Sequence, residues 1–305
     1  MVSESMNIGI IGAGSIGLLY SYYLSKFHHI TLYTKRQDQA IAIEKNGVSL
    51  HRGEDTLFSK DLNATDTSDY AESFLIVTVK QYQLEEIIMK FNTMEPKTIL
   101  FIQNGMGHLE HMSQLKQHQV YLGVVEHGSL KISDTSVRHT GIGRTKYARY
   151  PSHSEESKDL SHIFLHEDLH FPYVYLENWE EMLKEKLIVN AIVNPLTSLL
   201  QVKNGELIKN PLFNQIGYDL YLEVISILEY EYKKETLWLH IQEICASTAE
   251  NESSMYKDIQ QERPTEIDAI VGFLLKNAGD RSVPIIEFLF KAIKGKESQY
   301  RREES

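Results

Sequence analysis

One apolar stretch in the second half of the chain carries three polar side chains at regular spacing. Lys186, Asn190 and Asn194 follow one another at intervals of four residues among leucine, isoleucine and valine. On an α-helix a step of four residues turns by only about 40°, so the three side chains form one narrow stripe, which Thr197 continues. A lysine ammonium can stabilise and protonate an oxygen that gains negative charge, and amides can orient a substrate.

The helix that would carry this stripe, residues 179–200, is apolar nearly all round, so we expect it to be buried. A buried polar group without a hydrogen bond costs about 1–3 kcal/mol, and a buried lysine costs more or titrates down. One interpretation is a structural network, with Lys186 extending to water. The other is the wall of an active site, which three aligned polar groups on an apolar helix favour. Pro195 predicts a helix break beside the stripe.

A glycine-rich turn near the N-terminus is the second chemical feature. It has the pattern G-x-G-x-x-G, with an apolar run at residues 7–11 before it and a helical stretch at 18–27 after it. In this context the glycines permit a tight turn, close approach of a pyrophosphate and close helix packing. The following helix N-terminus offers N–H groups and a positive dipole to phosphates. The pattern predicts a dinucleotide site formed by Gly12, Ala13, Gly14, Ser15, Ile16 and Gly17.

The residues after the second predicted strand, 30–33, bear on the choice of cofactor. Enzymes that use NAD place an acid there to bind the ribose 2′-hydroxyl, whereas this chain has Thr34, Lys35 and Arg36. Two cations suit a 2′-phosphate through charge-assisted hydrogen bonds, so Lys35 and Arg36 favour NADP. The alternative is a solvated basic loop, and Asp38 would lie near the ribose if the loop took a different path.

Further apolar, β-branched runs alternate with helix-compatible stretches such as residues 82–91, which indicates a doubly wound α/β sheet. Ligands of such sheets bind beyond the carboxyl ends of the strands. Lys80 follows one of these runs, and Asn104 lies in a Gln-Asn-Gly-Met-Gly turn after another. Asn104 suits a ligand contact and a plain Asn-Gly turn equally well. The predicted strands are residues 74–79, 98–102 and 120–125.

The remaining pattern completes the predicted fold class, an N-terminal Rossmann-type α/β doubly wound sheet followed by an all-α C-terminal domain. Short β-like pieces in 127–150 are expected to extend the sheet with antiparallel strands, before a helix at 155–168 and a short strand at 173–176. From residue 179 onward the pattern is helical, including 211–232, 236–249 and 284–294. We place the domains at 1–176, with 1–5 as a loose leader, and at 177–305, with 295–305 as a frayed tail.

Composition narrows the class of protein. A chain of 305 residues with 42% hydrophobic content suits two globular domains. A net charge of −11 without a dense Lys/Arg cluster argues against a nucleic-acid partner. The apolar runs are too short to span a bilayer and no signal-peptide pattern is present, so a cytoplasmic protein is expected. The single cysteine, Cys245, has apolar neighbours and is interpreted as a buried structural thiol. No metal site is expected.

Several motifs that occur in order along the chain resemble those of the ketopantoate reductase (2-dehydropantoate 2-reductase) family, and the resemblance covers about residues 6–294. The helix with Lys186 and the block around Glu266 are far more specific than the glycine motif. The segments that carry the resemblance are residues 12–17, 77–80, 103–107, 186–190, 194–197, 204–207, 253–255 with Asp258, and 265–268.

The resemblance implies an N-terminal Rossmann domain, a helical domain of the 6-phosphogluconate dehydrogenase C-terminal type, and an active site in the cleft. It also implies reduction of 2-dehydropantoate to (R)-pantoate with NADPH, on the route to pantothenate and coenzyme A. By motif, Lys186 is the catalytic residue and Glu266 its acidic companion. From the residues alone, Thr265 and Glu266 are better explained as a helix cap and a first-turn acid.

The same resemblance assigns binding residues. The glycine loop, Lys80 and Asn104 belong with the cofactor, and Asn104 can also reach the substrate. The substrate group further contains Asn190, Asn194, Asn251 and Ser254.

One region departs from the family pattern. Glu126 and His127 stand where many members have small or hydroxyl residues. His127 could act as a base, but a single histidine after a strand is more often structural. The alternatives to this function are a reductase of another small 2-keto acid and an NADPH-binding regulator without turnover. A third alternative is a structural or interaction protein that uses its helical half as a dimer surface. Besides the small-molecule substrate, the partner considered is a second copy of the chain in a homodimer. Lys186 together with Glu266 favours an enzyme, since a regulator needs neither.

Overall fold

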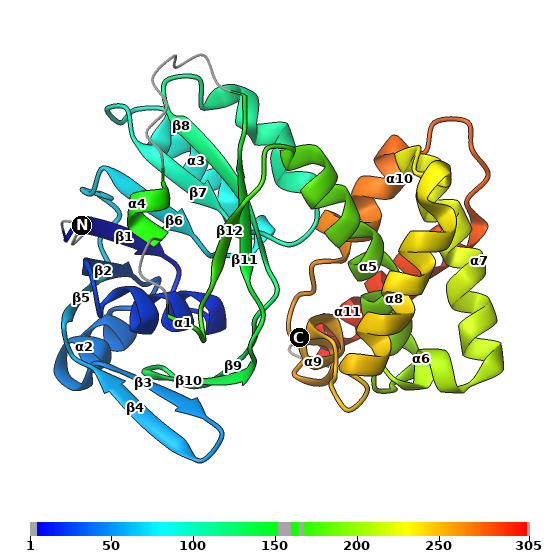
Figure 1. The fold of residues 1–305 in the computed structure, drawn as a ribbon, viewed down its shortest axis with the longest axis horizontal. Helices are drawn as coiled ribbons and strands as arrows, with labels where there is room; N and C mark the ends of the chain where they lie inside the picture. Colours follow the sequence, from blue (N-terminus) through cyan, green and yellow to red (C-terminus); the bar gives the residue numbers. More distant parts are fainter. Residues whose placement is uncertain (1–4, 152–159, 165–167, 304–305) are drawn as a thin grey trace. The chain divides into compact units, whose positions relative to one another are not determined.

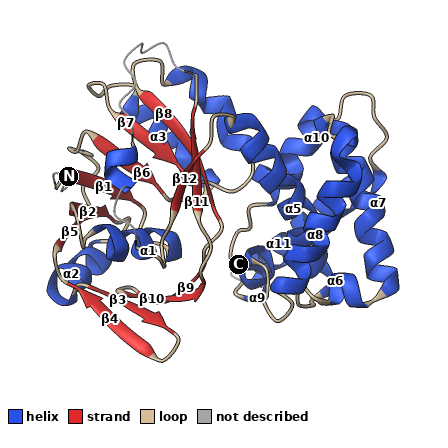
Figure 2. Ribbon diagram, viewed as in Figure 1, coloured by secondary structure: helices blue, strands red, loops and turns tan. Residues whose placement is uncertain are grey.

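The computed structural model describes residues 5–151, 160–164 and 168–303. The chain forms two compact units (Figure 1). Unit 1 contains Met1–Gln103 and Leu109–Met182, and unit 2 contains Asn104–His108 and Leu183–Ser305. Figure 2 shows strands and helices in unit 1 and helices in unit 2, which confirms the predicted fold class. Unit 2 takes the short segment Asn104–His108 from the middle of the first half, a division that no sequence pattern indicates.

Unit 1 is built on an eight-stranded sheet, in which every neighbouring pair is parallel except β8 and β11. The five strands predicted from apolar runs all form, within two residues of their predicted ends. In spatial order the strands are β12 (Tyr173–Tyr175), β11 (Thr145–Arg149), β8 (Gln119–Val125), β7 (Thr98–Phe101), β6 (Phe74–Val77), β1 (Asn7–Ile11), β2 (His29–Tyr33) and β5 (Leu62–Thr65).

The register of the parallel strands aligns their carboxyl ends. Ile11, the last residue of β1, pairs with Tyr33 of β2 and with Val77 of β6. Val77 in turn pairs with Phe101 of β7. The segments that follow these four strands therefore leave the sheet at one edge, where ligands of doubly wound sheets bind.

A second, four-stranded sheet corrects one expectation. Of the residues 127–150, only β11 extends the main sheet. The segment between β8 and β11 instead joins the smaller sheet, because Val48, Leu50 and Val137 share a hydrophobic core with α1 (Ser15–Leu24), which contacts strands of both sheets. The smaller sheet has the order β4 (Asp55–Ser59), β3 (Val48–Arg52), β10 (Ser136–Gly141) and β9 (Gly128–Ser133).

Helices cover both faces of the main sheet. Leu100 of β7 belongs to the core that includes α1. The next residue, Phe101, lies on the opposite face, and its ring contacts Phe91 of α3 (Leu84–Phe91). Most of the helix predicted at 155–168 lies outside the described residues. The remaining helical segments of this half are α2 (Gln37–Asn46), η1 (Gln81–Gln83), η2 (Gly107–Gln114) and α4 (Ser161–Phe164).

The C-terminal half is helical, as predicted. The helix with the polar stripe, α5 (Trp179–Leu200), has the predicted bounds, and Asn178 caps it by accepting a hydrogen bond from the Glu181 N–H at 3.0 Å. The helix predicted at 211–232 ends at Leu228, because Glu229 adopts a left-handed conformation with φ 60°. The other helices are α6 (Glu206–Lys209), α7 (Pro211–Leu228), η3 (Glu231–Lys233), α8 (Lys234–Ser247), α9 (Ser254–Gln260), the π-helix η4 (Asp268–Gly272), α10 (Phe273–Asn277) and α11 (Pro284–Glu303).

The break predicted at Pro195 does not occur, and α5 continues to Leu200. Proline removes one backbone donor, the one that would bind the Ala191 carbonyl oxygen, and hydroxyl groups in the next turn bind other carbonyl oxygens of the helix. Thr197 Oγ1 donates to Val193 O at 2.6 Å, and Ser198 Oγ donates to Asn194 O at 2.6 Å. Burial of nearly every side chain in this half of the helix then outweighs the local penalty of proline.

The tail predicted to fray is also helical, because α11 extends to Glu303. Glu297 accepts hydrogen bonds from the Thr265 N–H at 2.8 Å and from Thr265 Oγ1 at 2.7 Å. Tyr300 donates from its hydroxyl to Ile259 O at 3.0 Å. These contacts hold the last turns of α11 on the segment that precedes η4. Within the described part of the chain, no helix has both the length and the apolar character needed to cross a membrane.

Candidate functional site

Two glycines of the N-terminal turn are required by the packing of unit 1. Gly12 has φ +109°, and a Cβ atom there would come within 2.8 Å of Val79 Cγ1. A Cβ atom on Gly17 would overlap the carbonyl oxygen of Gly12. Thr78 fixes the same turn, since its Oγ1 donates to the carbonyl oxygens of Ile11 at 3.0 Å and Gly12 at 2.8 Å. The loop is therefore held tightly between β1, α1 and the end of β6.

Gly14 differs from its two neighbours in the motif. Its φ of −81° is open to any residue, and a Cβ atom there would meet no atom within 4 Å. The described residues thus give no steric reason for glycine at this position. Gly14 immediately precedes α1, whose first N–H groups have no intrahelical partner. A ligand that approaches this backbone closely explains the glycine, so the loop fits a pyrophosphate-containing cofactor.

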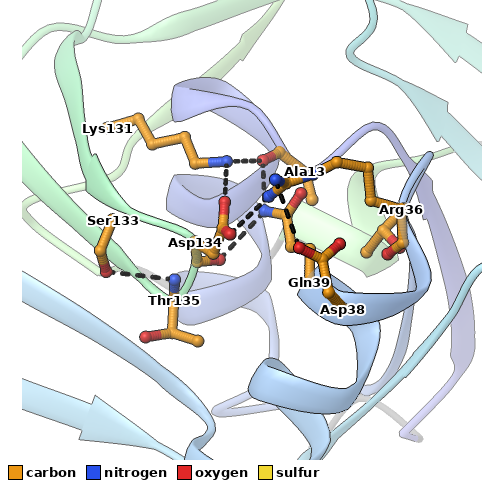
Figure 3. Close-up of polar contacts among 9 residues, drawn as sticks. Ala13, Arg36, Asp38, Gln39, Lys131, Ser133, Asp134 and Thr135 are labelled. Atoms are coloured by element: carbon orange, nitrogen blue, oxygen red, sulfur yellow. Dashed lines mark hydrogen bonds and ion pairs between the residues drawn. The ribbon is translucent and has the colours of Figure 1, made fainter.

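Arg36, in the basic segment after β2, lies beside Ala13 of this loop (Figure 3). Thr34 is buried and donates to Arg36 O at 2.7 Å, Lys35 is exposed, and Arg36 is the N-cap residue of α2. Arg36 forms an ion pair with Asp38 at 3.4 Å and donates a hydrogen bond to Asp134. Asp38 is 70% exposed in the first turn of α2, so it is engaged with Arg36 at the surface.

Three further residues that the sequence analysis did not identify lie around Ala13 and Arg36: Gln39, Lys131 and Asp134. Gln39 Nε2 donates to Ala13 O at 2.9 Å and to Asp134 O at 3.0 Å. Lys131 Nζ donates to Ala13 O at 3.3 Å and to Asp134 Oδ1 at 2.9 Å. Lys131 belongs to β9, and Asp134 lies in the turn between β9 and β10. Gln39 lies on α2, whereas the smaller sheet brings Lys131 and Asp134 to the glycine loop, so no local pattern marks those two positions.

Lys80 follows β6 at the same edge of the main sheet and is half-buried. The backbone around it is held by Gln103, whose Nε2 donates to Val77 O at 2.8 Å and Val79 O at 3.0 Å. The backbone that carries Lys80 is therefore fixed at the end of β6 in unit 1 by Gln103, which follows β7.

In unit 2 the polar stripe of α5 is buried except at its start. Asn190, Asn194 and Thr197 are buried, while Lys186 is half-buried. The stripe leads to α9, because the hydroxyl groups of Thr197 and Ser253 are hydrogen-bonded with their oxygens 2.8 Å apart. Ser253 Oγ also accepts from the Tyr256 N–H at 3.1 Å and so caps α9. Ser254, the first residue of α9, is exposed beside this cap.

Asn104 and Glu266 meet within unit 2. Asn104 Nδ2 donates a hydrogen bond to Glu266 Oε2 at 3.0 Å. The backbone beside them is fixed as well, since Met106 N donates to Ala269 O at 3.2 Å and a Cβ atom on Gly105 (φ +78°) would overlap the same oxygen. The Asn104–Gly105 pair therefore forms a turn that packs closely against η4, and the Asn104 amide also binds the Glu266 carboxylate.

Thr265 lies before η4, whose N-cap residue is Ile267 and which has no side-chain cap. Its Oγ1 accepts a hydrogen bond from the Ile267 N–H at 3.2 Å. Glu266 is half-buried and its Oε2 is bonded to the Asn104 amide. Its position in the sequence suggested only a first-turn acid that balances a helix dipole. In the structure Glu266 also binds the Asn104 amide.

Asn251 lies in the turn between α8 and α9 and is exposed. Asn204 holds this turn, since its backbone N–H donates to Asn251 O at 3.0 Å and its Nδ2 donates to Thr248 Oγ1 at 3.0 Å. A Cβ atom on Gly205 would lie 2.6 Å from the Cβ of Ala249. The Asn-Gly pair at 204–205 therefore positions the segment that leads to Asn251 and Ser254.

Glu126 and His127 do not join either group of residues. Glu126 forms ion pairs with Lys146 at 2.7 Å and Arg144 at 3.5 Å. His127 is buried and stacks on Phe171 with ring centroids 4.4 Å apart. Burial, and then the nearby His139, lower the pKa of His127 to about 3, which fits the structural interpretation.

Cys245 is likewise structural. It is buried in α8, and burial raises the pKa of its thiol to about 11, so a reactive thiolate is disfavoured. Among the described residues, no group of three or more His, Cys, Asp or Glu side chains is arranged to hold a metal ion.

Comparison with known proteins gives the family. The model described as "Ketopantoate reductase PanE/ApbA" matches residues 8–152, and its C-terminal counterpart matches residues 178–297. The 2-dehydropantoate 2-reductase of Bacillus subtilis strain 168 is 42% identical over 295 residues, covering 96% of this chain and 98% of the relative. That of Listeria innocua is 38% identical over 307 residues, covering 98% and 99%.

Solved structures agree with this. The crystal structure of the probable 2-dehydropantoate 2-reductase of Bacillus subtilis has a TM-score of 0.86 at 40% identity and covers 96% of this chain and 100% of its own. A ternary structure of D-mandelate dehydrogenase with NADH and anilino(oxo)acetate has a TM-score of 0.84 at 20% identity and covers 97% and 99%, a likeness of fold alone. The chain belongs to the ketopantoate reductase family, whose members are oxidoreductases that use a nicotinamide cofactor.

Proposed function

We propose that the chain is an NADPH-dependent 2-dehydropantoate 2-reductase that forms (R)-pantoate for pantothenate and coenzyme A synthesis in the cytoplasm. The observation that carries the proposal is the arrangement in unit 2. Lys186 stands at the more exposed end of a buried amide stripe, and Glu266 is held by Asn104 in the same unit. The relatives at 42% and 38% identity, both 2-dehydropantoate 2-reductases, support the choice of substrate.

Lys186 is the proposed general acid. Bound NADPH supplies the hydride that reduces the keto carbon. The keto oxygen then gains negative charge, which the Lys186 ammonium stabilises and neutralises by giving up a proton. Glu266 is the proposed acidic companion that aims the lysine ammonium at the keto oxygen. Asn104 acts through Glu266, because its amide fixes one carboxylate oxygen.

The remaining residues of unit 2 bind and orient the keto acid. Asn190 and Asn194 project from rigid turns of α5 and offer amide donors and acceptors. Ser254 would bind the substrate carboxylate, and its neighbour Ser253 is already used as the α9 cap. Asn251 would bind the distal hydroxyl of the substrate from the turn that Asn204 holds.

The residues of unit 1 fit the cofactor. The open face of Gly14 and the free N–H groups at the start of α1 suit the pyrophosphate. Arg36 and Lys35 suit the 2′-phosphate, and Lys80 stands at the end of β6 on the same edge of the sheet. Loss of cofactor binding with folding intact is therefore expected from changes at Gly14, Lys35 or Arg36.

The test is oxidation of NADPH at 340 nm with 2-dehydropantoate, run beside pyruvate, 2-ketoisovalerate and NADH. Fast turnover confined to 2-dehydropantoate with NADPH supports the proposal. Turnover with a different 2-keto acid alone would replace the substrate and keep the reaction type. Tight NADPH binding without turnover on any of these acids would favour a regulator and contradict the proposal.

A further inference from the structure

Three charged side chains from two distant segments of the sequence meet beside the glycine loop (Figure 3). Arg36 precedes α2, Lys131 belongs to β9, and Asp134 lies in the β9–β10 turn. Lys131 Nζ donates to Asp134 Oδ1 at 2.9 Å, and Arg36 Nη2 donates to Asp134 Oδ2. A single carboxylate thus holds two cations together.

This cluster is attached to the loop that would bind the cofactor. Lys131 Nζ and Gln39 Nε2 both donate to the carbonyl oxygen of Ala13, at 3.3 and 2.9 Å. Gln39 Nε2 also donates to Asp134 O at 3.0 Å. Ala13 immediately precedes Gly14, whose open side admits a ligand. The two cations therefore lie where the adenosine ribose is recognised in this fold, at the end of the second strand.

The charges of the cluster would let a bound phosphate replace the Asp134 carboxylate as the partner of the two cations. The pKa of the Asp134 carboxyl is lowered, first by the hydrogen bond from Lys131 and then by the one from Arg36, although burial acts in the opposite direction. Asp134 is therefore ionised at neutral pH. The side chains of Arg36, Lys131 and Asp134 are 51%, 31% and 37% exposed, which leaves all three within reach of a ligand. The two cations exceed the Asp134 carboxylate by one positive charge, and Asp38, which pairs with Arg36 at 3.4 Å, balances that charge.

We propose that Lys131 binds the 2′-phosphate of NADPH together with Arg36, and that Asp134 is the residue that limits discrimination between NADPH and NADH. Without cofactor, Asp134 holds the two cations in position. When NADPH binds, Arg36 and Lys131 transfer their hydrogen bonds from the Asp134 carboxylate to the phosphate. With NADH there is no phosphate, and Asp134 can accept a hydrogen bond from the ribose hydroxyl, as acids at this place do in NAD enzymes. The inference rests on the cofactor side of the proposed function.

The experiment measures dissociation constants of the full chain without substrate, by quenching of protein fluorescence. NADPH and NADH are compared, and then 2′,5′-ADP and ADP, which differ in the 2′-phosphate and lack the nicotinamide. Lys131→Gln should weaken NADPH and 2′,5′-ADP about tenfold, because a charge-assisted hydrogen bond is lost. NADH and ADP should change less than about twofold.

Asp134→Asn should act in the opposite direction. It should tighten NADPH and 2′,5′-ADP several-fold, because the competing charge is removed, and it should leave NADH and ADP unchanged or weaker. Arg138→Gln and Asp55→Asn are the matched controls, since they make the same charge changes on exposed positions of the smaller sheet outside the cluster. Thermal unfolding of each variant shows whether the fold is kept.

Two outcomes would overturn the inference. One is that Lys131→Gln changes the affinity for 2′,5′-ADP no more than Arg138→Gln does. The other is that Asp134→Asn weakens 2′,5′-ADP and ADP equally, which would make Asp134 a merely structural residue. Either result leaves the substrate assay untouched, whereas failure of that assay with normal 2′,5′-ADP binding would contradict the proposed function alone.

Discussion

Asn104 and Glu266 are joined by a hydrogen bond of 3.0 Å from the amide Nδ2 to the carboxylate Oε2, although 162 residues separate them in the sequence. The bond lies within unit 2, because Asn104–His108 belongs to that unit. The same segment packs against Ala269 of η4, through a hydrogen bond from the Met106 N–H and the close approach of Gly105. The orientation of the proposed acidic companion of Lys186 therefore depends on a loop that follows a strand of the other unit.

Replacing Asn104 by aspartate places a second carboxylate against Glu266. Two carboxylates at this distance cannot both ionise without cost, so one of them takes a raised pKa. We expect kcat of Asn104→Asp to be low at pH 8 and to recover partly toward pH 5–6, where the pair can share a proton. The measurement is kcat against pH for both proteins. Asn104→Ala removes the donor without adding charge and should be impaired without this recovery, whereas parallel profiles for Asn104→Asp and Asn104→Ala would refute the explanation.

Lys186→Ala should abolish most turnover while leaving cofactor affinity nearly intact. The lysine is proposed to act on the substrate oxygen, and general-acid catalysis typically contributes a factor of about 10²–10⁴. Steady-state kcat and the NADPH dissociation constant are the two measurements. Lys184→Ala is the control, because Lys184 is on the same helix but lies over the ring of Tyr230, 5.4 Å from its centroid. A Lys186→Ala protein with kcat close to that of Lys184→Ala would remove Lys186 from the chemistry.

Local patterns predicted the parts of the molecule that are locally determined. The glycine turn and the full extent of α5 follow from short-range spacing, since strand, turn and helix preferences agree there. Pro195 is the counter-example, because packing around α5 overrides a local rule. Lys131 and Asp134 were missed because the pairing of β10 with β3 is what brings Lys131 to Ala13 and Asp134 to Arg36. Long-range contacts of this kind leave no periodic signal.

The two glycines at 14 and 17 should separate ligand binding from folding. Gly17→Ala forces a methyl group onto the Gly12 carbonyl oxygen, and overpacking of this kind typically costs about 1–3 kcal/mol or more. Gly14→Ala meets no atom within 4 Å, so its free energy of unfolding should stay within about 0.5 kcal/mol of the parent. NADPH affinity of Gly14→Ala should nevertheless fall at least tenfold, since about 1.4 kcal/mol of lost close contact suffices.

Urea unfolding and cofactor titration measure the two effects. The interpretation of Gly14 as a site of close ligand approach fails if Gly14→Ala binds NADPH as the parent does. Loss of stability in Gly14→Ala equal to that in Gly17→Ala would instead show that the turn itself requires both glycines.

Acid should destabilise the protein partly through His127. Burial, and then His139, lower its folded-state pKa to about 3, below the value of about 6.5 in an unfolded chain. As pH falls below about 6.5 the unfolded state therefore binds a proton that the folded state does not, so the stabilisation is complete above that pH and is lost as pH falls toward 3. One such proton gives a slope of at most about 1.4 kcal/mol per pH unit. His139, whose pKa burial also lowers, adds to the same slope.

His127→Gln should make the free energy of unfolding less dependent on pH between about 4 and 6. Glutamine can keep an acceptor for the Gly143 N–H, which donates to His127 Nδ1 at 3.2 Å, but it does not titrate. Urea unfolding at several pH values gives the slope, and His240→Gln is the control because His240 is an exposed histidine on α8. If the variant at 127 and the control have equal slopes, His127 is protonated as easily in the folded protein as in the unfolded chain, and its place against Phe171 does not exclude the proton.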